Sequence, residues 1–105
     1  MRIEFLYYAD CPSHEEALAR LKGAMAAEGV EADIHIIEVK SDQEAQQLRF
    51  IGSPTIRIDG EDIDPEGLEG QQYALTCRVY TKRDGRPSPA PETALIRARL
   101  RGEIQ

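Results

Sequence analysis

Cys11 and the three residues after it carry the clearest potential for chemistry in this sequence. An apolar and aromatic run of strand type, Ile3 to Tyr8, ends just before the cysteine, and apolar residues recur at helical spacing just after it. Pro12 suits the first position of a helix, so the pattern predicts Cys11 at the N-cap. Unpaired backbone N–H groups and the positive end of the helix dipole favour a thiolate there. The position alone predicts a reactive cysteine.

Three other side chains could take part in this chemistry. His14 could donate to a Cys11 thiolate or protonate a leaving thiol, and it could equally be a solvated residue of the first helical turn. Asp10 would oppose thiolate formation but could deliver a proton to a carbon leaving group, and a solvated loop carboxylate is the favoured interpretation. Cys77 lies midway along a predicted strand, where a buried core residue is favoured over a catalytic one.

The elements around Cys11 predict a β-α-β unit. A helix from Ser13 to Glu28 ends at Gly29, and Val30 to Lys40 reads as a strand covered on both faces. A helix that links two strands of one sheet normally makes a right-handed crossover between parallel strands. Cys11 is then at the carboxyl end of the first strand, where sites of open α/β sheets concentrate.

The rest of the chain predicts two helices and two strands with irregular segments between them. In order, these are a helix from Ser41 to Arg49, a strand from Thr55 to Asp59, an irregular stretch over 61–72, a strand from Tyr73 to Thr81, a loop over 82–91 and a helix from Glu92 to Arg101. We expect the two strands to form an antiparallel pair, with Cys77 and Val79 on one face and Arg78 and Tyr80 on the other. The predicted order is β-α-β-α-β-β-α, an α/β fold with a central four-stranded mixed sheet.

Length and composition narrow the classes of function. The 105 residues predict a single domain over 1–105. No apolar run is long enough to cross a bilayer, and the N-terminus has no signal-peptide pattern, so we expect a cytoplasmic protein with no membrane partner. A net charge of −6 argues against nucleic-acid binding. No cysteines and histidines have zinc-site spacing, so we expect neither a structural metal nor a cofactor.

Two local motifs, taken with this element order, resemble the thioredoxin fold over nearly the whole chain. Cys11-Pro12-Ser13-His14 is similar to the active-site motif of thioredoxin-like proteins, and Gly52-Ser53-Pro54-Thr55 is similar to their cis-proline loop. In that fold the loop packs against the active cysteine, and its backbone pairs with an extended peptide or thiol ligand. The resemblance therefore implies a cis bond before Pro54. It also implies a substrate site lined by Pro12, Ser13, Ser53, Pro54 and Thr55.

The chain departs from that pattern at His14, where a dithiol oxidoreductase has its second cysteine. A disulfide formed between Cys11 and a substrate must then be resolved by an external thiol or by Cys77. We expect a thiol–disulfide oxidoreductase-like protein that uses Cys11, with His14 and Cys77 as further catalytic candidates. Its partners would be protein or small-molecule thiols and disulfides. Whether it is an enzyme stays open.

A narrower resemblance leaves two alternatives. Phe5-Leu6-Tyr7, Cys11-Pro12, Gly52 to Ile56 and Cys77 to Tyr80 are similar to a group of small bacterial thioredoxin-fold proteins, some labelled as relatives of organomercury (alkylmercury) lyases. The shared inventory is two thiols and a carboxylate, here Cys11, Cys77 and Asp10. The first alternative is a protein that handles a soft metal or an organomercurial through the two thiolates, with a thiophilic metal compound as partner. The second is a thioredoxin-fold binding module without catalysis.

Overall fold

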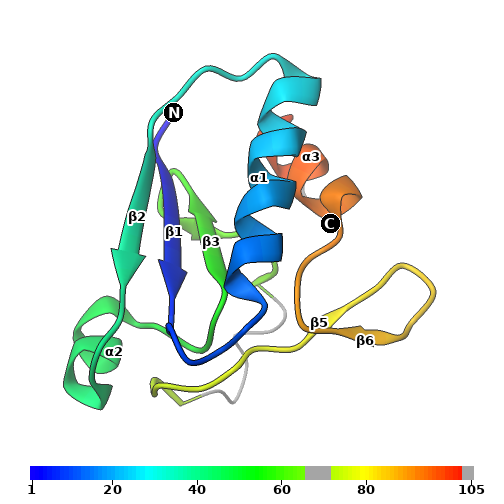
Figure 1. The fold of residues 1–105 in the computed structure, drawn as a ribbon. Helices are drawn as coiled ribbons and strands as arrows, with labels where there is room; N and C mark the ends of the chain where they lie inside the picture. The colour runs from blue at the N-terminus through cyan, green and yellow to red at the C-terminus, as the bar shows by residue number, and fades with distance from the viewer. Residues whose placement is uncertain (66–71, 103–105) are drawn as a thin grey trace.

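The computed structural model describes residues 1–65 and 72–102, which form a mixed α/β fold (Figure 1). The elements in chain order are β1 (Ile3–Tyr7), α1 (His14–Glu28), β2 (Ile34–Glu38), α2 (Asp42–Leu48), β3 (Thr55–Ile58), β4 (Glu61–Asp62), β5 (Tyr80–Thr81), β6 (Pro87–Ser88) and α3 (Thr93–Leu100). The main sheet has the order β2-β1-β3-β4, and β5 pairs with β6. Since β1 is parallel to β2 and antiparallel to β3, the predicted four-stranded mixed sheet is confirmed.

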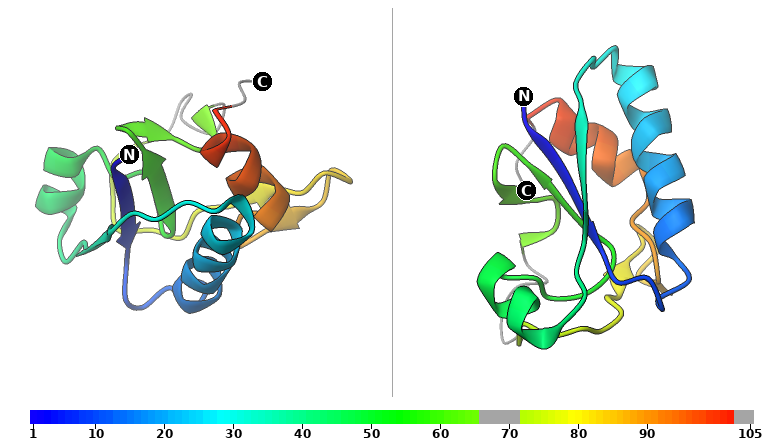
Figure 2. Two further views of the ribbon diagram at one scale, coloured as in Figure 1. Left: turned by 90° about the horizontal axis from the view of Figure 1, so that it is seen from above. Right: turned by 60° about the vertical axis from the view of Figure 1, so that its left-hand side comes forward.

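Helices cover both faces of this sheet. Figure 2 (left) shows α1 and α3 side by side on one face and α2 on the other. Successive residues of β1 point to opposite faces, so Phe5 packs in the core beneath α1 and α3 while Leu6 packs with Val39 and Phe50 near α2. The sheet thus separates two apolar clusters, and β1 contributes to both.

Local sequence signals explain where the first two helices end or begin. Gly29 closes α1 in the left-handed conformation with φ 67°, as predicted. Ser41 caps α2 by accepting the Glu44 N–H at 3.1 Å, and the Glu44 carboxylate accepts the Lys40 N–H at 3.0 Å. Ser41 and Glu44 therefore satisfy two backbone N–H groups at the start of α2.

The prediction of a strand over residues 73–81 paired with β3 is wrong. Only Tyr80–Thr81 is a strand, and it pairs with Pro87–Ser88 inside the expected loop. On the side away from β1, the partner of β3 is β4, which lies inside the stretch predicted to be irregular. Asp59 and Gly60 both have positive φ, so the chain reverses at once and β4 occupies the edge of β3. Positions 66–71 of that stretch lie outside the described residues.

The prediction that residues 30–40 form a strand covered on both faces also needs correction. β2 spans only Ile34–Glu38 and is the edge strand of the sheet. Ile36 is 51% exposed, so this strand is not covered on both faces. Within the described residues, no helix is long and apolar enough to cross a membrane.

Candidate functional site at Cys11 and Cys77

A disulfide joins Cys11 to Cys77 across 66 residues of sequence, with the two Cα atoms 5.8 Å apart. The prediction that Cys77 is a core residue is wrong, because its side chain is exposed, whereas Cys11 is only 2% exposed. Cys77 belongs to an irregular segment that runs past the carboxyl end of β1 (Figure 1). The structure therefore brings together the two cysteines whose separation the sequence left open.

The sequence predicts Cys11 as the N-cap of α1, and this prediction is wrong. The N-cap is Ser13, whose carbonyl accepts the Ala17 N–H at 3.1 Å, and the helix begins at His14. Cys11 instead sits in a turn closed by its own N–H on the Tyr8 carbonyl at 3.0 Å, which delays the helix by two residues. Its sulfur lies 3.6 Å from the buried Ser13 hydroxyl. A hydroxyl, rather than the first backbone N–H groups, is the nearby donor for a thiolate at this position.

The loop before β3 forms the floor of the site. The Ser53–Pro54 peptide bond is cis, as predicted. The Ser53 carbonyl oxygen is 3.6 Å from the Cys11 sulfur, and Thr55 donates its hydroxyl to the Gly52 carbonyl at 2.6 Å. Ser53, Pro54 and Thr55 are all buried. Of the predicted substrate-binding residues, Ser13 and Ser53 thus approach the Cys11 sulfur directly.

The backbone of Ser53 carries the segment that contains Cys77. The Ser53 N–H donates to the Thr76 carbonyl at 2.8 Å, and the Arg78 N–H donates to the Ser53 carbonyl at 2.9 Å, a parallel bridge opposite Cys77. Gly52 permits this approach, because a Cβ on it would lie 2.8 Å from the Arg78 Cβ. The buried Ser53 hydroxyl has no hydrogen-bond partner among the described residues. The loop therefore sets Cys77 opposite Cys11.

A buried ion pair, missed by sequence reasoning, fixes the next residue of the segment. Arg78 donates two hydrogen bonds to the Asp62 carboxylate at 2.7 and 2.8 Å and one to the Asp64 carbonyl at 3.0 Å. Both charged side chains of the pair are 4% exposed. Burial opposes the charge of Arg78 most strongly, but the hydrogen bonds to Asp62 and the electrostatic effects of Tyr80, Asp62 and Asp64 together outweigh it and raise the pKa of the guanidinium. The guanidinium is therefore charged.

An aromatic residue completes this interior anchor. The guanidinium of Arg78 lies over the ring of Tyr80, 4.4 Å from its centroid. The Tyr80 hydroxyl donates to the Pro54 carbonyl at 2.6 Å, and burial raises the pKa of Tyr80. The predicted alternation of side chains holds here, because Arg78 and Tyr80 are buried while Val79 is 67% exposed. No local signal in the sequence pairs Arg78 with Asp62, which lies 16 positions earlier.

The other two polar candidates pair with tyrosines. The His14 ring stacks on Tyr7 with centroids 4.6 Å apart, and Asp10 accepts the Tyr8 hydroxyl at 3.1 Å. The hydrogen bond to Asp10 and the charge of Asp10 raise the pKa of Tyr8. The polar contacts of the Cys11 sulfur in the described structure are with Ser13 and Ser53, not with His14 or Asp10. The observed contacts of His14 and Asp10 are therefore with tyrosines and do not support an acid–base role for either side chain at the disulfide.

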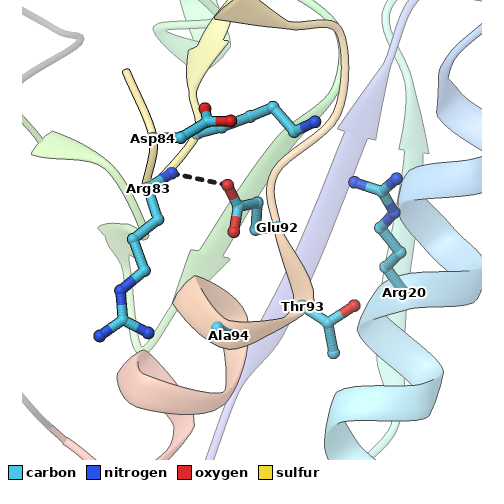
Figure 3. Close-up of a pocket in the computed structure, with 7 residues that line it drawn as sticks. Arg20, Arg83, Asp84, Glu92, Thr93 and Ala94 are labelled. Atoms are coloured by element: carbon cyan, nitrogen blue, oxygen red, sulfur yellow. Dashed lines mark hydrogen bonds between the residues drawn. The ribbon is translucent and has the colours of Figure 1, made fainter. Parts of the chain in front are cut away.

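Two features elsewhere in the described structure bear on metal and ligand binding. Among residues 1–65 and 72–102, no three His, Cys, Asp or Glu side chains are grouped to hold a metal ion. Figure 3 shows a shallow pocket beside α1 and the start of α3. Its lining consists of Arg20, Lys82, Arg83, Asp84, Glu92, Thr93 and Ala94. It shares no residue with the predicted site, and the Arg83 N–H already donates to Glu92 at 2.6 Å.

Comparison of the chain with protein-family models, with curated proteins and with solved structures gave no significant match.

Proposed function

We propose that the protein is a thiol–disulfide oxidoreductase with a thioredoxin-like fold, and that Cys11 and Cys77 are its redox couple. The observation that carries the proposal is the disulfide between a buried cysteine at the end of β1 and an exposed cysteine on the surface. In this couple Cys77 replaces the second cysteine that the Cys11–His14 motif lacks. The sheet order β2-β1-β3-β4 and the cis bond before Pro54 are compatible with the thioredoxin-like assignment.

The surroundings of the couple suit reversible exchange. Exposure of Cys77 gives an outside thiol access to the disulfide, which a fully buried staple would lack. Ser13 lies close enough to donate its hydroxyl to a Cys11 thiolate when the disulfide opens. The segment around Cys77 keeps its hydrogen bonds to Ser53 without using either sulfur, so both redox states can share one backbone arrangement.

A redox titration of the native protein tests this function. The protein is equilibrated with glutathione buffers and with dithiothreitol, its free thiols are blocked with a maleimide, and the mass is measured. We expect one two-electron transition between the disulfide and two thiols, with a folded protein on both sides. Cys11→Ala and Cys77→Ala should each abolish catalysed reduction of a small disulfide substrate. A disulfide that opens only after unfolding in urea would make the bridge a structural one and end the proposal.

The adjacency of the two sulfurs also supports a second candidate function. When reduced, two thiolates held this close could bind one two-coordinate thiophilic ion such as Hg²⁺. Asp10, the proposed proton donor in an organomercurial reaction, is exposed and hydrogen-bonded to Tyr8. Titration of the reduced protein with Hg²⁺, followed by sulfur-to-metal absorption, tests this candidate. One ion bound per chain, lost in Cys77→Ala, would favour it, and identical binding by Cys77→Ala would reject it.

A further inference from the structure

The two cysteine residues of the disulfide differ in their access to solvent. Cys11 is 2% exposed, and the residues that approach its sulfur, Ser13 and Ser53, are themselves 7% and 0% exposed. Cys77 is exposed and is flanked by Thr76, which is also exposed. Cys77 therefore lies on the solvent side of the bond and Cys11 on the protein side.

Arg78 explains why this arrangement should survive reduction. Neighbouring residues in an extended segment point to opposite sides, so an inward Arg78 requires an outward Cys77. Arg78 is held inward by Asp62, Asp64 and the ring of Tyr80, and its N–H is bonded to Ser53. None of these contacts uses a sulfur atom.

Resting on the proposed function, we infer that outside thiols exchange with this disulfide at Cys77. Cys77 is then the catalytic residue that carries the mixed disulfide, and Cys11 is the internal thiol that leaves and returns. This order of roles is the reverse of the one that the Cys11–His14 motif predicts. Access decides it, because a thiolate must reach a sulfur from the side opposite the bond that breaks.

The reductive half of the cycle can be written with glutathione as the reductant. A glutathione thiolate attacks the Cys77 sulfur, a bond forms between these two sulfurs, and the Cys11–Cys77 bond breaks with its electron pair on Cys11. A second glutathione thiolate attacks the sulfur of the bound glutathione, releasing glutathione disulfide and the Cys77 thiolate. The protein gains two electrons and, once both thiolates are protonated, two protons. Two glutathiones are oxidised to one disulfide.

The polar groups near Cys11 suit an internal leaving group. Ser13 Oγ, 3.6 Å from the sulfur, can donate to the departing thiolate. The Ser53 carbonyl oxygen, also at 3.6 Å, can accept the S–H once the thiol is protonated. The buried Cys11 is thus provided with one partner for each protonation state, whereas the exposed Cys77 relies on solvent.

The decisive experiment maps the mixed disulfide on the full chain. Oxidised wild-type protein is mixed with excess glutathione and quenched with acid at short times, free thiols are blocked with N-ethylmaleimide, and peptides are mapped by mass spectrometry. We expect glutathione on Cys77 and N-ethylmaleimide on Cys11. Glutathione found mainly on Cys11 would overturn the inference while leaving the proposed function intact. A native disulfide that does not exchange at all would overturn both.

A matched pair of variants gives a second, independent measurement. Cys11→Ala leaves Cys77 as the sole thiol, and Cys77→Ala leaves Cys11, while both keep the anchor at Arg78. We expect the thiol of Cys11→Ala to react with 5,5′-dithiobis(2-nitrobenzoate) about tenfold or more faster than that of Cys77→Ala in the native state. In urea the two rates should converge. Equal native rates, with both variants shown to be folded by circular dichroism, would contradict the inference.

Discussion

The segment around Cys77 is held by two anchors of opposite character on adjacent residues. On the outside, Cys77 is tied to Cys11 by a bond that a thiol can open. On the inside, Arg78 is tied to Asp62 by a buried ion pair that no redox reagent touches. The outer anchor joins an exposed cysteine to a buried one, whereas both side chains of the inner anchor are buried.

The residues proposed to react, Cys11 and Cys77, thus differ from the residues that hold the segment in place, Arg78 and Asp62. If the disulfide alone held the segment, reduction would let Cys77 move away from Cys11. The two thiols would then have to come together again before re-oxidation. With Arg78 bonded to the cis-proline loop through its N–H, we expect the two thiols to stay close after reduction, so that re-oxidation is intramolecular. The predictions below test each anchor and the contact between them.

Removal of the inner anchor should have the largest effect. Asp62→Ala leaves the Arg78 charge buried without its partner, and such losses typically cost about 3–5 kcal/mol of unfolding free energy. We expect this loss in both the oxidised and the reduced protein, measured by urea unfolding monitored by circular dichroism. In the reduced protein, re-oxidation by glutathione disulfide should also slow.

A surface pair provides the matched control for this prediction. Asp84 is 3.7 Å from Arg86, and both side chains are mostly exposed. Asp84→Ala should leave the unfolding curve unchanged within error, because exposed pairs contribute little. Equal losses of unfolding free energy in Asp62→Ala and Asp84→Ala would show that the buried ion pair stabilises the protein no more than the surface pair does.

Opening the outer anchor should cost less than losing the inner one. A cross-link spanning 66 residues restricts the unfolded chain by about 4 kcal/mol in the chain-entropy model, and measured values are commonly about 2–4 kcal/mol. We therefore expect Cys77→Ala, or reduction by dithiothreitol, to lower the unfolding free energy by that range while the protein stays folded. Unfolding of the reduced protein at room temperature would contradict the idea that Arg78 holds the segment alone.

Gly52 is the residue of the cis-proline loop that lies against Arg78. A Cβ there would meet the Arg78 Cβ at 2.8 Å, and Gly52 has a φ of 148°. We expect Gly52→Ala to cost about 1–3 kcal/mol and to slow re-oxidation of the cysteines by pushing the Cys77 segment away. Gly85→Ala is the control, because Gly85 also has a positive φ but its Cβ would meet no atom within 4 Å. A similar rate of re-oxidation in the two variants would sink this explanation.

The elements near Cys11 could be predicted because their signals are local. The apolar and aromatic run from Ile3, the helix stop at Gly29 and the helix start at Ser41 each depend on a few neighbouring residues, and the structure has β1, α1 and α2 at these places. Asp59-Gly60 is likewise a local turn signal, and it decides which strand pairs with β3. A turn that tight pairs β3 with β4, the very next residues, and leaves no place beside β3 for residues 73–81.

The candidate site could be predicted only in part, because its second half depends on contacts between distant segments. The Cys11 motif and the loop at Pro54 were visible in the sequence, whereas Cys77 looked like a core residue among apolar neighbours. Cys77 points outward because its neighbour Arg78 points inward to Asp62. A buried ion pair between two distant residues leaves no pattern in the sequence near either of them. The N-cap was misplaced for a different, local reason, because the turn from Tyr8 to Cys11 delays the start of the helix.

Substitution of Ser13 should have the smallest effect. It tests whether the surroundings of the Cys11 sulfur and the Cys77 sulfur differ in their influence on reactivity. Its hydroxyl lies 3.6 Å from the Cys11 sulfur, so Ser13→Ala removes the donor for the thiolate that leaves when the disulfide opens. One weak hydrogen bond to a charged sulfur is worth about 1 kcal/mol, and we expect reduction by glutathione to slow by about fivefold. Stopped-flow reduction of the oxidised protein measures this. The alkylation rate of Cys77 in a Cys11→Ala background should not change when Ser13→Ala is added, because Ser13 faces only the inner sulfur. A slowing of both reactions would mean that Ser13 acts through the backbone at the start of α1 rather than through the thiolate.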